Sequence, residues 1–226
     1  MAENKQDETI VDVDKLYTQS EDFFEKNKKQ ITIVGTVIVA IIGIFLAYTN
    51  LYQKPRIQEA QELIWKAQYY FEIDSLDRAI QGDGTNFGFQ YIASEYSGTP
   101  SGDLANYYLG ICYLQKGEFP AAIDYLKKAD LDDKLVGAIA KGGIADAFVE
   151  LGDLGQAIKY YDKAISHDKN MFSAPLYIMK KALVLEELGK YDEALKAYEN
   201  IKKNYPESAE AQEIDKYIAK ASSYVG

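Results

Sequence analysis

A long uncharged stretch near the amino terminus limits what this chain can fold into. Between Lys29 and Lys54 there are 24 consecutive residues without a charged side chain. As a helix, this stretch would be about 36 Å long, which is enough to cross a hydrocarbon core of about 30 Å. A lone strand would leave its backbone groups unpaired in lipid. We therefore predict a single membrane-spanning helix over residues 30–53.

The composition of this stretch indicates that it is retained as an anchor. A cleaved signal peptide has an apolar core of about 7 to 15 residues that closes on small side chains. This run is longer and closes on bulky Leu46, Tyr48 and Leu51. Small side chains within it would let another helix approach closely, although they are also simply common in membrane helices. These small residues are Gly35, Ala40, Gly43 and Ala47.

The charges that flank the span predict its orientation. Lys26, Lys28 and Lys29 precede it, and Lys54 and Arg56 follow it, so the positive charge is greater on the amino-terminal side. Positive charge in short loops collects on the cytoplasmic side of a membrane. We therefore predict a cytoplasmic amino terminus. In a bacterial inner membrane, the remainder of the chain would then be periplasmic.

Beyond residue 100 the sequence repeats itself. Gly117, Gly152 and Gly189 follow helical stretches at spacings of 35 and 37 residues. An alanine lies five residues after each glycine, where a small side chain lets the two helices of a hairpin touch. A large side chain comes four residues later and can fill the groove between hairpins. The alanines are Ala122, Ala157 and Ala194, and the large residues are Leu126, Tyr161 and Tyr198. The pattern resembles the tetratricopeptide repeat (TPR), which implies a stack of helical hairpins.

These patterns together predict an all-α chain with one amino-terminal transmembrane helix, a TPR-like α-solenoid and a carboxy-terminal capping helix. The segment "FGFQYIASEYSGTP" is interpreted as the second helix of the degenerate first repeat, and the glycine-rich stretch before it as an exposed insertion. A helix begins near Pro55, and the last helix begins near Ser208. The predicted parts are a mobile acidic tail (1–10), an amphipathic juxtamembrane segment (11–29), the span (30–53), a degenerate first repeat (55–100), three repeats (101–207) and the cap (208–226).

The residue composition argues against several classes of function. The formal net charge is -10, so the chain has no overall basic surface for nucleic acid. Cys112 and His167 are the only cysteine and the only histidine, which leaves no ligand set for a metal site and no catalytic pair. We therefore expect no enzymatic activity, no cofactor and no nucleic-acid partner.

The repeat spacing instead predicts a groove lined by the first helix of each hairpin. The mixture of apolar and acidic side chains expected there suits an extended or helical peptide segment. The lysine, asparagine and arginine with which TPR cochaperones hold a terminal carboxylate are absent from the equivalent positions. The predicted groove residues are Tyr107, Ile111 and Leu114 from one repeat, Asp146 and Val149 from the next, and Met179, Leu183 and Glu186 from the last.

The order of parts suggests a more specific resemblance. A short acidic tail and the run Phe23, Phe24 and Asn27 stand before a single span, which is followed by repeats. In this the chain resembles the YfgM-type ancillary subunit of the bacterial Sec translocon. The resemblance implies an inner-membrane protein whose periplasmic repeats associate with translocon subunits, a periplasmic chaperone or exported polypeptides.

Two alternatives remain open from the sequence. The repeats could hold one fixed partner, as a structural or regulatory subunit of a cell-envelope assembly or motility complex. The same order of parts would also fit an organelle import receptor with its repeats in the cytosol. All three hypotheses require a protein partner, and they differ in the side of the membrane and in the lifetime of the complex.

Overall fold

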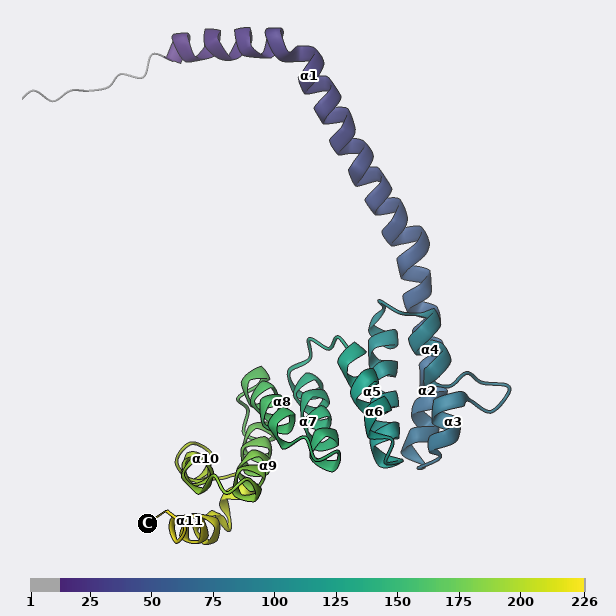
Figure 1. Cartoon of the computed structure of the whole chain (residues 1–226). Coiled ribbons are helices and arrows are strands. Elements are labelled where there is room, and N and C mark those ends of the chain that lie inside the picture. The colour runs from purple at the N-terminus through teal and green to yellow at the C-terminus, as the bar shows by residue number, and fades with distance from the viewer. Residues whose placement is uncertain (1–12, 226) are drawn as a thin grey trace, which may run out of the picture. The chain divides into compact units, whose positions relative to one another are not determined.

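The computed structural model describes residues 13–225, and all the regular secondary structure in that range is helical. The predicted tail over residues 1–10 lies outside the described residues. The chain divides into two units, Met1–Pro55 and Arg56–Gly226. Figure 1 shows the helices in chain order. Their bounds are α1 Val13–Tyr48, the π-helical turn η1 Thr49–Gln53, α2 Lys54–Glu72, α3 Leu76–Gln81, α4 Phe89–Glu95, α5 Pro100–Gln115, α6 Phe119–Lys128, α7 Lys134–Glu150, α8 Leu154–His167, α9 Ser173–Glu187, α10 Tyr191–Asn204, the 3-10 turn η2 Ala209–Ala211 and α11 Ile214–Ser222.

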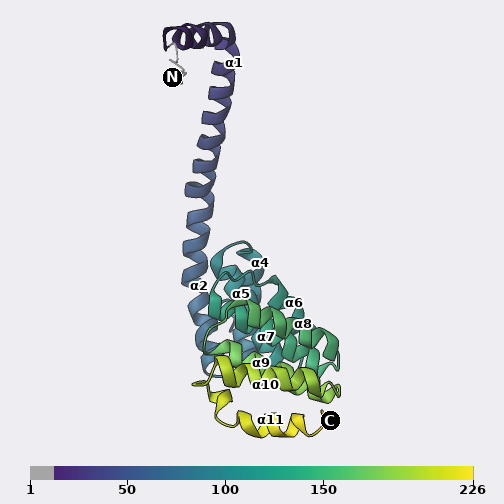
Figure 2. The same ribbon diagram turned by 90° about the vertical axis from the view of Figure 1, so that its left-hand side faces the viewer.

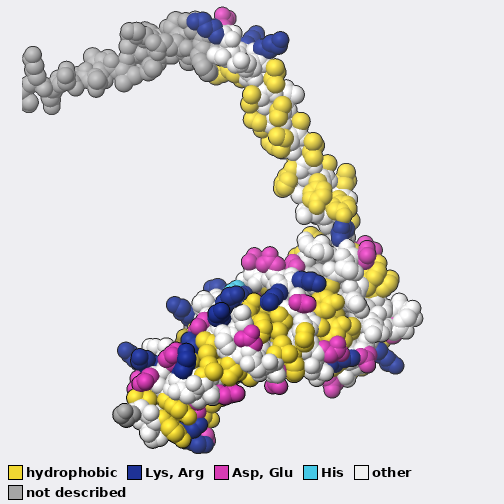
Figure 3. Space-filling model, viewed as in Figure 1, with side chains coloured by type: hydrophobic (Ala, Val, Ile, Leu, Met, Phe, Trp, Pro, Cys, Tyr) yellow, Lys and Arg dark blue, Asp and Glu magenta, His cyan; other side chains and the backbone are white. Residues whose placement is uncertain are grey.

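Helix α1 carries the long apolar run. Among the described residues, one helical stretch, Phe24–Glu72, contains a segment that is long and apolar enough to cross a membrane, and none of that segment is buried. Hydrophobic side chains cover this part of the helix, with charged side chains at its start (Figure 3). The backbone of the predicted juxtamembrane segment is helical from Val13 onward and belongs to the same helix as the span, which bends once along its length (Figure 1).

The helix predicted to begin near Pro55 is α2, which begins at Lys54, but the backbone before it is already helical. The π-helical turn η1 joins α1 to α2, and the N–H of Lys54 bonds to the carbonyl of Thr49, five residues back. Proline lacks the N–H for the next helical bond, and its ring crowds the carbonyl four residues earlier. A π turn widens the helix locally, which accommodates both effects.

Four turns of the same geometry join the helices of the repeats. Gly117, Gly152 and Gly189 have φ values of 75°, 74° and 71°, and Asp74 takes the same conformation with a φ of 59°. The residue after each donates its N–H to the carbonyl five residues back, at 2.8 to 2.9 Å. This pair of features defines a Schellman turn, which satisfies carbonyls left over at a helix end. Asp74 therefore occupies, in the turn of the first repeat, the position that glycine occupies in the other three repeats.

Small side chains hold each helical hairpin together. Each of the four repeats has a buried small residue in its first helix and a buried alanine in its second helix. The first lies seven residues before the turn residue of its repeat, and the alanine lies five residues after it. Small residues at both positions allow the two helix axes to approach closely. In the first helices these are Ala67, Gly110, Ala145 and Ala182, and in the second helices they are Ala79, Ala122, Ala157 and Ala194.

The second helix of the first repeat is interrupted. It begins as α3, directly after the Asp74 turn, and the segment "FGFQYIASEYSGTP" forms only its continuation, α4. Residues 82–88 form a loop between them, closed by the bridge between Gly82 and Phe87. The carboxylate of Asp83 accepts bonds from the Tyr70 hydroxyl and from the N–H groups of Thr85 and Asn86. These donors, Tyr70 first, hold the pKa of Asp83 well below its usual range.

The carboxy-terminal end of the stack is covered by α11. The last helix does not begin at Ser208 as predicted: Ser208 caps the short turn η2, accepting from the N–H of Ala211 at 3.3 Å, and α11 starts at Ile214. Ile214 and Ala221 are buried in one cluster with Tyr198 and Ile201 of α10. Figure 2 shows α11 lying beside α10 as the final layer of the stack. This arrangement covers the apolar face that the last repeat would otherwise expose.

Candidate functional site

The first helices of the repeats form one face of the stack. Helix α5 contacts α7, and α7 contacts α9, whereas the second helices α6, α8 and α10 make no comparable contacts with one another. Helices that approach more closely lie on the inner side of a curved stack. We call the surface formed by α5, α7 and α9 the inner face. It corresponds to the groove that the sequence predicts.

Two adjacent glycines allow this close approach at α7. A Cβ on Gly142 would lie 2.1 Å from the ring of Tyr177 in α9. A Cβ on Gly143 would lie 3.1 Å from the side chain of Leu114 in α5. The pair therefore lets α7 pack against both neighbouring first helices.

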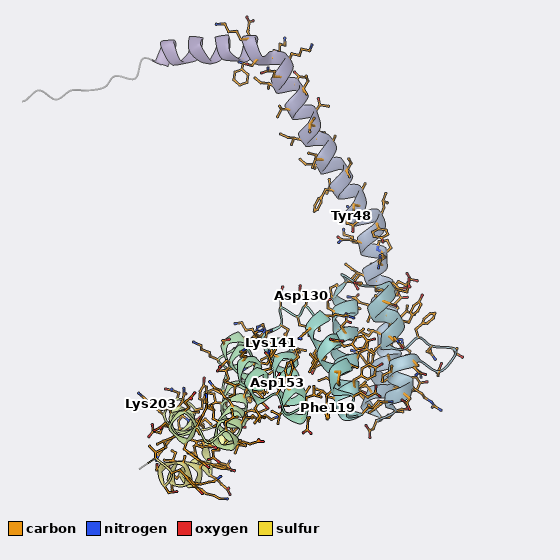
Figure 4. The ribbon with its side chains drawn as sticks, viewed as in Figure 1. Tyr48, Phe119, Asp130, Lys141, Asp153 and Lys203 are labelled. Atoms are coloured by element: carbon orange, nitrogen blue, oxygen red, sulfur yellow. The ribbon has the colours of Figure 1, made fainter. Side chains whose placement is uncertain are left out.

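A pocket of about 390 Å³ lies between α7 and α9. Seven of its eight residues come from the carboxy-terminal halves of these two helices, toward the edge of the stack where the hairpin turns lie, and the eighth, Tyr161, comes from α8. Figure 4 shows Phe119 and Asp153, which follow two of those turns, near that edge, and Asp130 at the opposite edge. The pocket is lined by Asp146, Val149, Glu150, Tyr161, Lys180, Leu183, Val184 and Glu187.

Asp146 is held by two partners in this pocket. The hydroxyl of buried Tyr161 donates to one carboxylate oxygen at 2.6 Å, and the ammonium group of Lys180 lies 2.7 Å from the other. Burial, followed by the bond to Asp146, raises the pKa of Tyr161 far above its usual value, so this hydroxyl stays protonated. Both oxygens of Asp146 are thus engaged within the protein.

Two other carboxylates in the pocket have no such partners. Glu150 and Glu187 are exposed, and neither makes a hydrogen bond or an ion pair with any residue in the described range. They occupy equivalent positions in successive repeats, 37 residues apart, like Ala145 and Ala182. Leu183 lines the same pocket and is 42% exposed. The pocket therefore combines an accessible apolar floor with a rim of free negative charge.

The structure brings together three of the eight predicted groove residues. Asp146, Val149 and Leu183 all line the pocket. Tyr107, Ile111 and Leu114 are half-buried and pack against a cluster that contains Ile144 and Ala147 of α7. Their side chains fill the contact between α5 and α7, although they remain on the inner face.

Met179 and Glu186 lie elsewhere. Met179 is half-buried against the cluster formed by α9, α10 and α11. Glu186 is 8% exposed and meets Lys220 of α11 at 2.5 Å, so it is a buried residue of the α9 and α11 contact and does not line the pocket. The predicted groove position of Glu186 is therefore wrong. The repeat spacing predicted a groove residue at Glu186, whereas the next residue, Glu187, lines the pocket.

Sequence reasoning missed Glu150, Lys180 and Glu187 as members of the site. The repeat alignment could have identified Glu150 and Glu187, because they occupy equivalent positions 37 residues apart. The pairing of Lys180 with Asp146 joins different repeats and carries no local sequence signal.

The small residues of the predicted span lie exposed along α1. A Cβ placed on Gly35 or Gly43 would meet no other atom within 4 Å, and Ala40 and Ala47 are also exposed. Within the described chain, no other helix packs against these four positions.

The comparisons with known proteins agree with this architecture. Three tetratricopeptide repeat models match the chain, over residues 90–135, 140–170 and 177–208. Two similar solved structures are crystal structures of nearly identical TPR-like repeats from a kinesin light chain of Podosopora anserina, one of them a point variant. Each structure is 14% identical to this chain, and the match covers 75% of this chain and 88% of the solved chain. The TM-score is 0.55 for the variant and 0.56 for the other structure. No curated protein matches the chain.

These matches confirm the predicted repeats and the all-α solenoid. At this level of identity the solved structures establish the fold alone. A TPR fold is typically a non-enzymatic scaffold that binds other proteins.

Proposed function

We propose that this chain, a protein-interaction adaptor by its tetratricopeptide repeats, is tethered to a membrane by α1 and binds polypeptide segments in the pocket between α7 and α9. The observation that carries the proposal is the exposed apolar floor of that pocket, with Leu183 at 42% exposure on the inner face. Repeat solenoids present an extended concave surface that they use for binding, and the inner face is that surface here.

The anchor rests on the 24-residue uncharged run and on the helix that contains it. An unburied apolar helix of this length is costly in water and stable in a bilayer. A tether of this kind keeps a weakly binding pocket near its clients, because it raises their local concentration. The adaptor function therefore does not require high intrinsic affinity.

We further propose that the membrane is the bacterial inner membrane, with a cytoplasmic amino terminus and periplasmic repeats. The greater positive charge on the amino-terminal side of the span supports this orientation. The partner class proposed is a Sec translocon subunit, an exported polypeptide or a periplasmic chaperone, on the basis of the resemblance in the order of parts.

Membrane attachment and orientation are tested together. In membranes washed with sodium carbonate the full chain should remain in the pellet. Protease added to spheroplasts should digest the repeats and spare the residues before the span. Digestion of the repeats only after lysis would place them in the cytoplasm and favour the arrangement of an organelle-type receptor.

The partner is tested by purifying the full chain in detergent from cells treated with a reversible crosslinker. Translocon subunits or a mixture of exported polypeptides should copurify, and a Leu183→Asp variant should lose them while keeping its helical content. One fixed stoichiometric partner from another envelope complex would instead support a structural or regulatory subunit.

A further inference from the structure

The charges in the pocket between α7 and α9 differ in how accessible they are to a partner. The only ammonium group in the lining, that of Lys180, is paired with Asp146 at 2.7 Å. Asp146 in turn has its second oxygen bonded to Tyr161. These two charges therefore offset each other in an ion pair whose side chains are each 36% exposed.

The charges left for a partner are negative. Glu150 and Glu187 are exposed, and neither forms an ion pair with a basic group in the described range. Burying either carboxylate under a partner without compensation would cost free energy, because an ionised group loses its hydration. An acidic segment would add repulsion to that cost, and the chain as a whole carries a net charge of -10. A basic segment would instead gain an ion pair at each rim residue.

The floor of the pocket adds a second requirement. Val149 and Leu183 offer apolar surface in the same lining as the two carboxylates, so a partner must also supply an apolar side chain. From these two requirements we infer that the site accepts a cationic and apolar polypeptide segment, in which lysine or arginine residues flank an apolar residue. This inference rests on the proposed function, since it specifies the partner of the same pocket.

The repeat geometry sets an approximate spacing for the basic residues. Glu150 and Glu187 sit at equivalent positions of adjacent first helices, and packed helices lie about 8 to 10 Å apart. An extended segment advances about 3.3 Å per residue, so two basic residues about three positions apart match the two carboxylates. The apolar side chain lies between them and faces Leu183.

Three pools of twelve-residue peptides test this inference against the full chain in detergent or in nanodiscs. Each pool has varied flanking residues and two test positions three residues apart, with an apolar residue between them, and the test positions are both lysine, both glutamine or both glutamate. Fluorescence anisotropy should show at least about tenfold tighter binding of the lysine pool than of the glutamate pool. Raising the ionic strength should reduce this preference, because exposed ion pairs are screened by salt.

Two double variants test whether the rim residues cause the preference for the lysine pool. Replacing both rim residues, Glu150→Gln with Glu187→Gln, should weaken binding of the lysine pool about fivefold or more and leave the glutamine pool unchanged. The matched control, Glu199→Gln with Glu207→Gln, makes the same change of net charge at exposed residues outside the pocket and should preserve the preference.

The outcomes separate this inference from the proposed function. Equal binding of the three pools, or tighter binding of the glutamate pool, would overturn the cationic preference and leave a peptide-binding pocket in place. An equal loss in the control variant would show that net charge, and not the rim, selects the peptide. Failure of every pool to bind would overturn both the inference and the proposed pocket.

Discussion

Asp74 occupies a conformation that an L-amino acid adopts at a cost. Its φ of 59° lies in the left-handed region, where the three equivalent turns of the stack have glycine. Such a backbone costs an ordinary residue about 1 kcal/mol or more, and aspartate somewhat less. The first repeat therefore retains the turn of the others with a less suitable residue.

Substituting glycine at this turn should stabilise the protein. We expect Asp74→Gly to raise the free energy of unfolding by about 0.5 to 1 kcal/mol, because the strain at the left-handed position is relieved. The reverse change, Gly152→Ala, should lower it by about 1 kcal/mol. Urea titration followed by circular dichroism measures both. No gain from Asp74→Gly would mean that the aspartate side chain compensates for its backbone.

Asp83 should make the insertion loop sensitive to acid. Its pKa is depressed in the folded protein, so the stability it contributes is present above the unfolded value of about 3.9 and is lost as the pH falls toward the lower folded value. Hydrogen exchange at Thr85 and Asn86 should therefore quicken, relative to its intrinsic rate, as the pH is lowered from about 5 to about 2. Asp83→Asn should show no such acid step, and an identical profile in both proteins would refute the assignment.

At the scale of helices, glycine in α7 serves packing against its neighbours. Alanine normally favours a helix by up to about 1 kcal/mol over glycine. At Gly142, however, the added Cβ would meet the ring of Tyr177 in α9 at 2.1 Å. The contact between α7 and α9 should outweigh helix propensity here.

Two glycine substitutions test this balance. Gly142→Ala should destabilise the protein by about 1 to 3 kcal/mol, as overpacking does. Gly155→Ala, where the nearest atom to the new Cβ would be 3.7 Å away, should be neutral or stabilising by up to about 1 kcal/mol. Thermal unfolding of both variants gives the comparison. If Gly142→Ala is as stable as Gly155→Ala, close approach is not the reason for this glycine.

The cap α11 is held in part by a charge from the last repeat. Lys220 meets one carboxylate oxygen of buried Glu186, and the other oxygen lies buried, as does the Tyr198 hydroxyl. Burial, followed by the charge of Glu186, raises the pKa of Tyr198, which keeps that hydroxyl protonated. Removing Lys220 would leave the carboxylate of Glu186 buried and unpaired.

Removal of this lysine should therefore loosen α11. Hydrogen exchange across α11 should be faster in Lys220→Met than in Lys216→Met, because Lys216 has only an exposed partner at 3.8 Å. Adding Glu186→Gln to Lys220→Met should restore protection by removing the buried charge. A Lys220 variant with the exchange rates of the Lys216 variant would show that apolar packing alone holds the cap.

The sequence predicts the repeats well, since their recurring glycines and alanines report local geometry directly. The first repeat was only partly predictable, because Asp74 replaces the marker glycine and an insertion splits its second helix. The continuous helix through Pro55 was not predicted, since proline normally favours a helix start. At the site, Asp146, Val149 and Leu183 followed from repeat spacing, whereas the burial of Glu186 depends on α11, which lies outside the repeat pattern.

At the scale of the molecule, the proposed anchor and the binding pocket belong to separate units of the chain. The first unit contains the long apolar helix, and the second contains the four hairpins and their cap. In the function proposed here, the anchor concentrates the pocket at a membrane, and the pocket binds segments that appear there. This function requires that the pocket between α7 and α9 is the working surface.

Site-specific photo-crosslinking from position 183 in the full, membrane-embedded chain tests that claim most directly. A photoreactive residue at Leu183 should capture other polypeptides, and the same residue at Glu199, which is exposed outside the pocket, should capture none above background. Addition of the lysine peptide pool should suppress capture at position 183. Capture that is equal at the two positions, or absent at both, would contradict the claim.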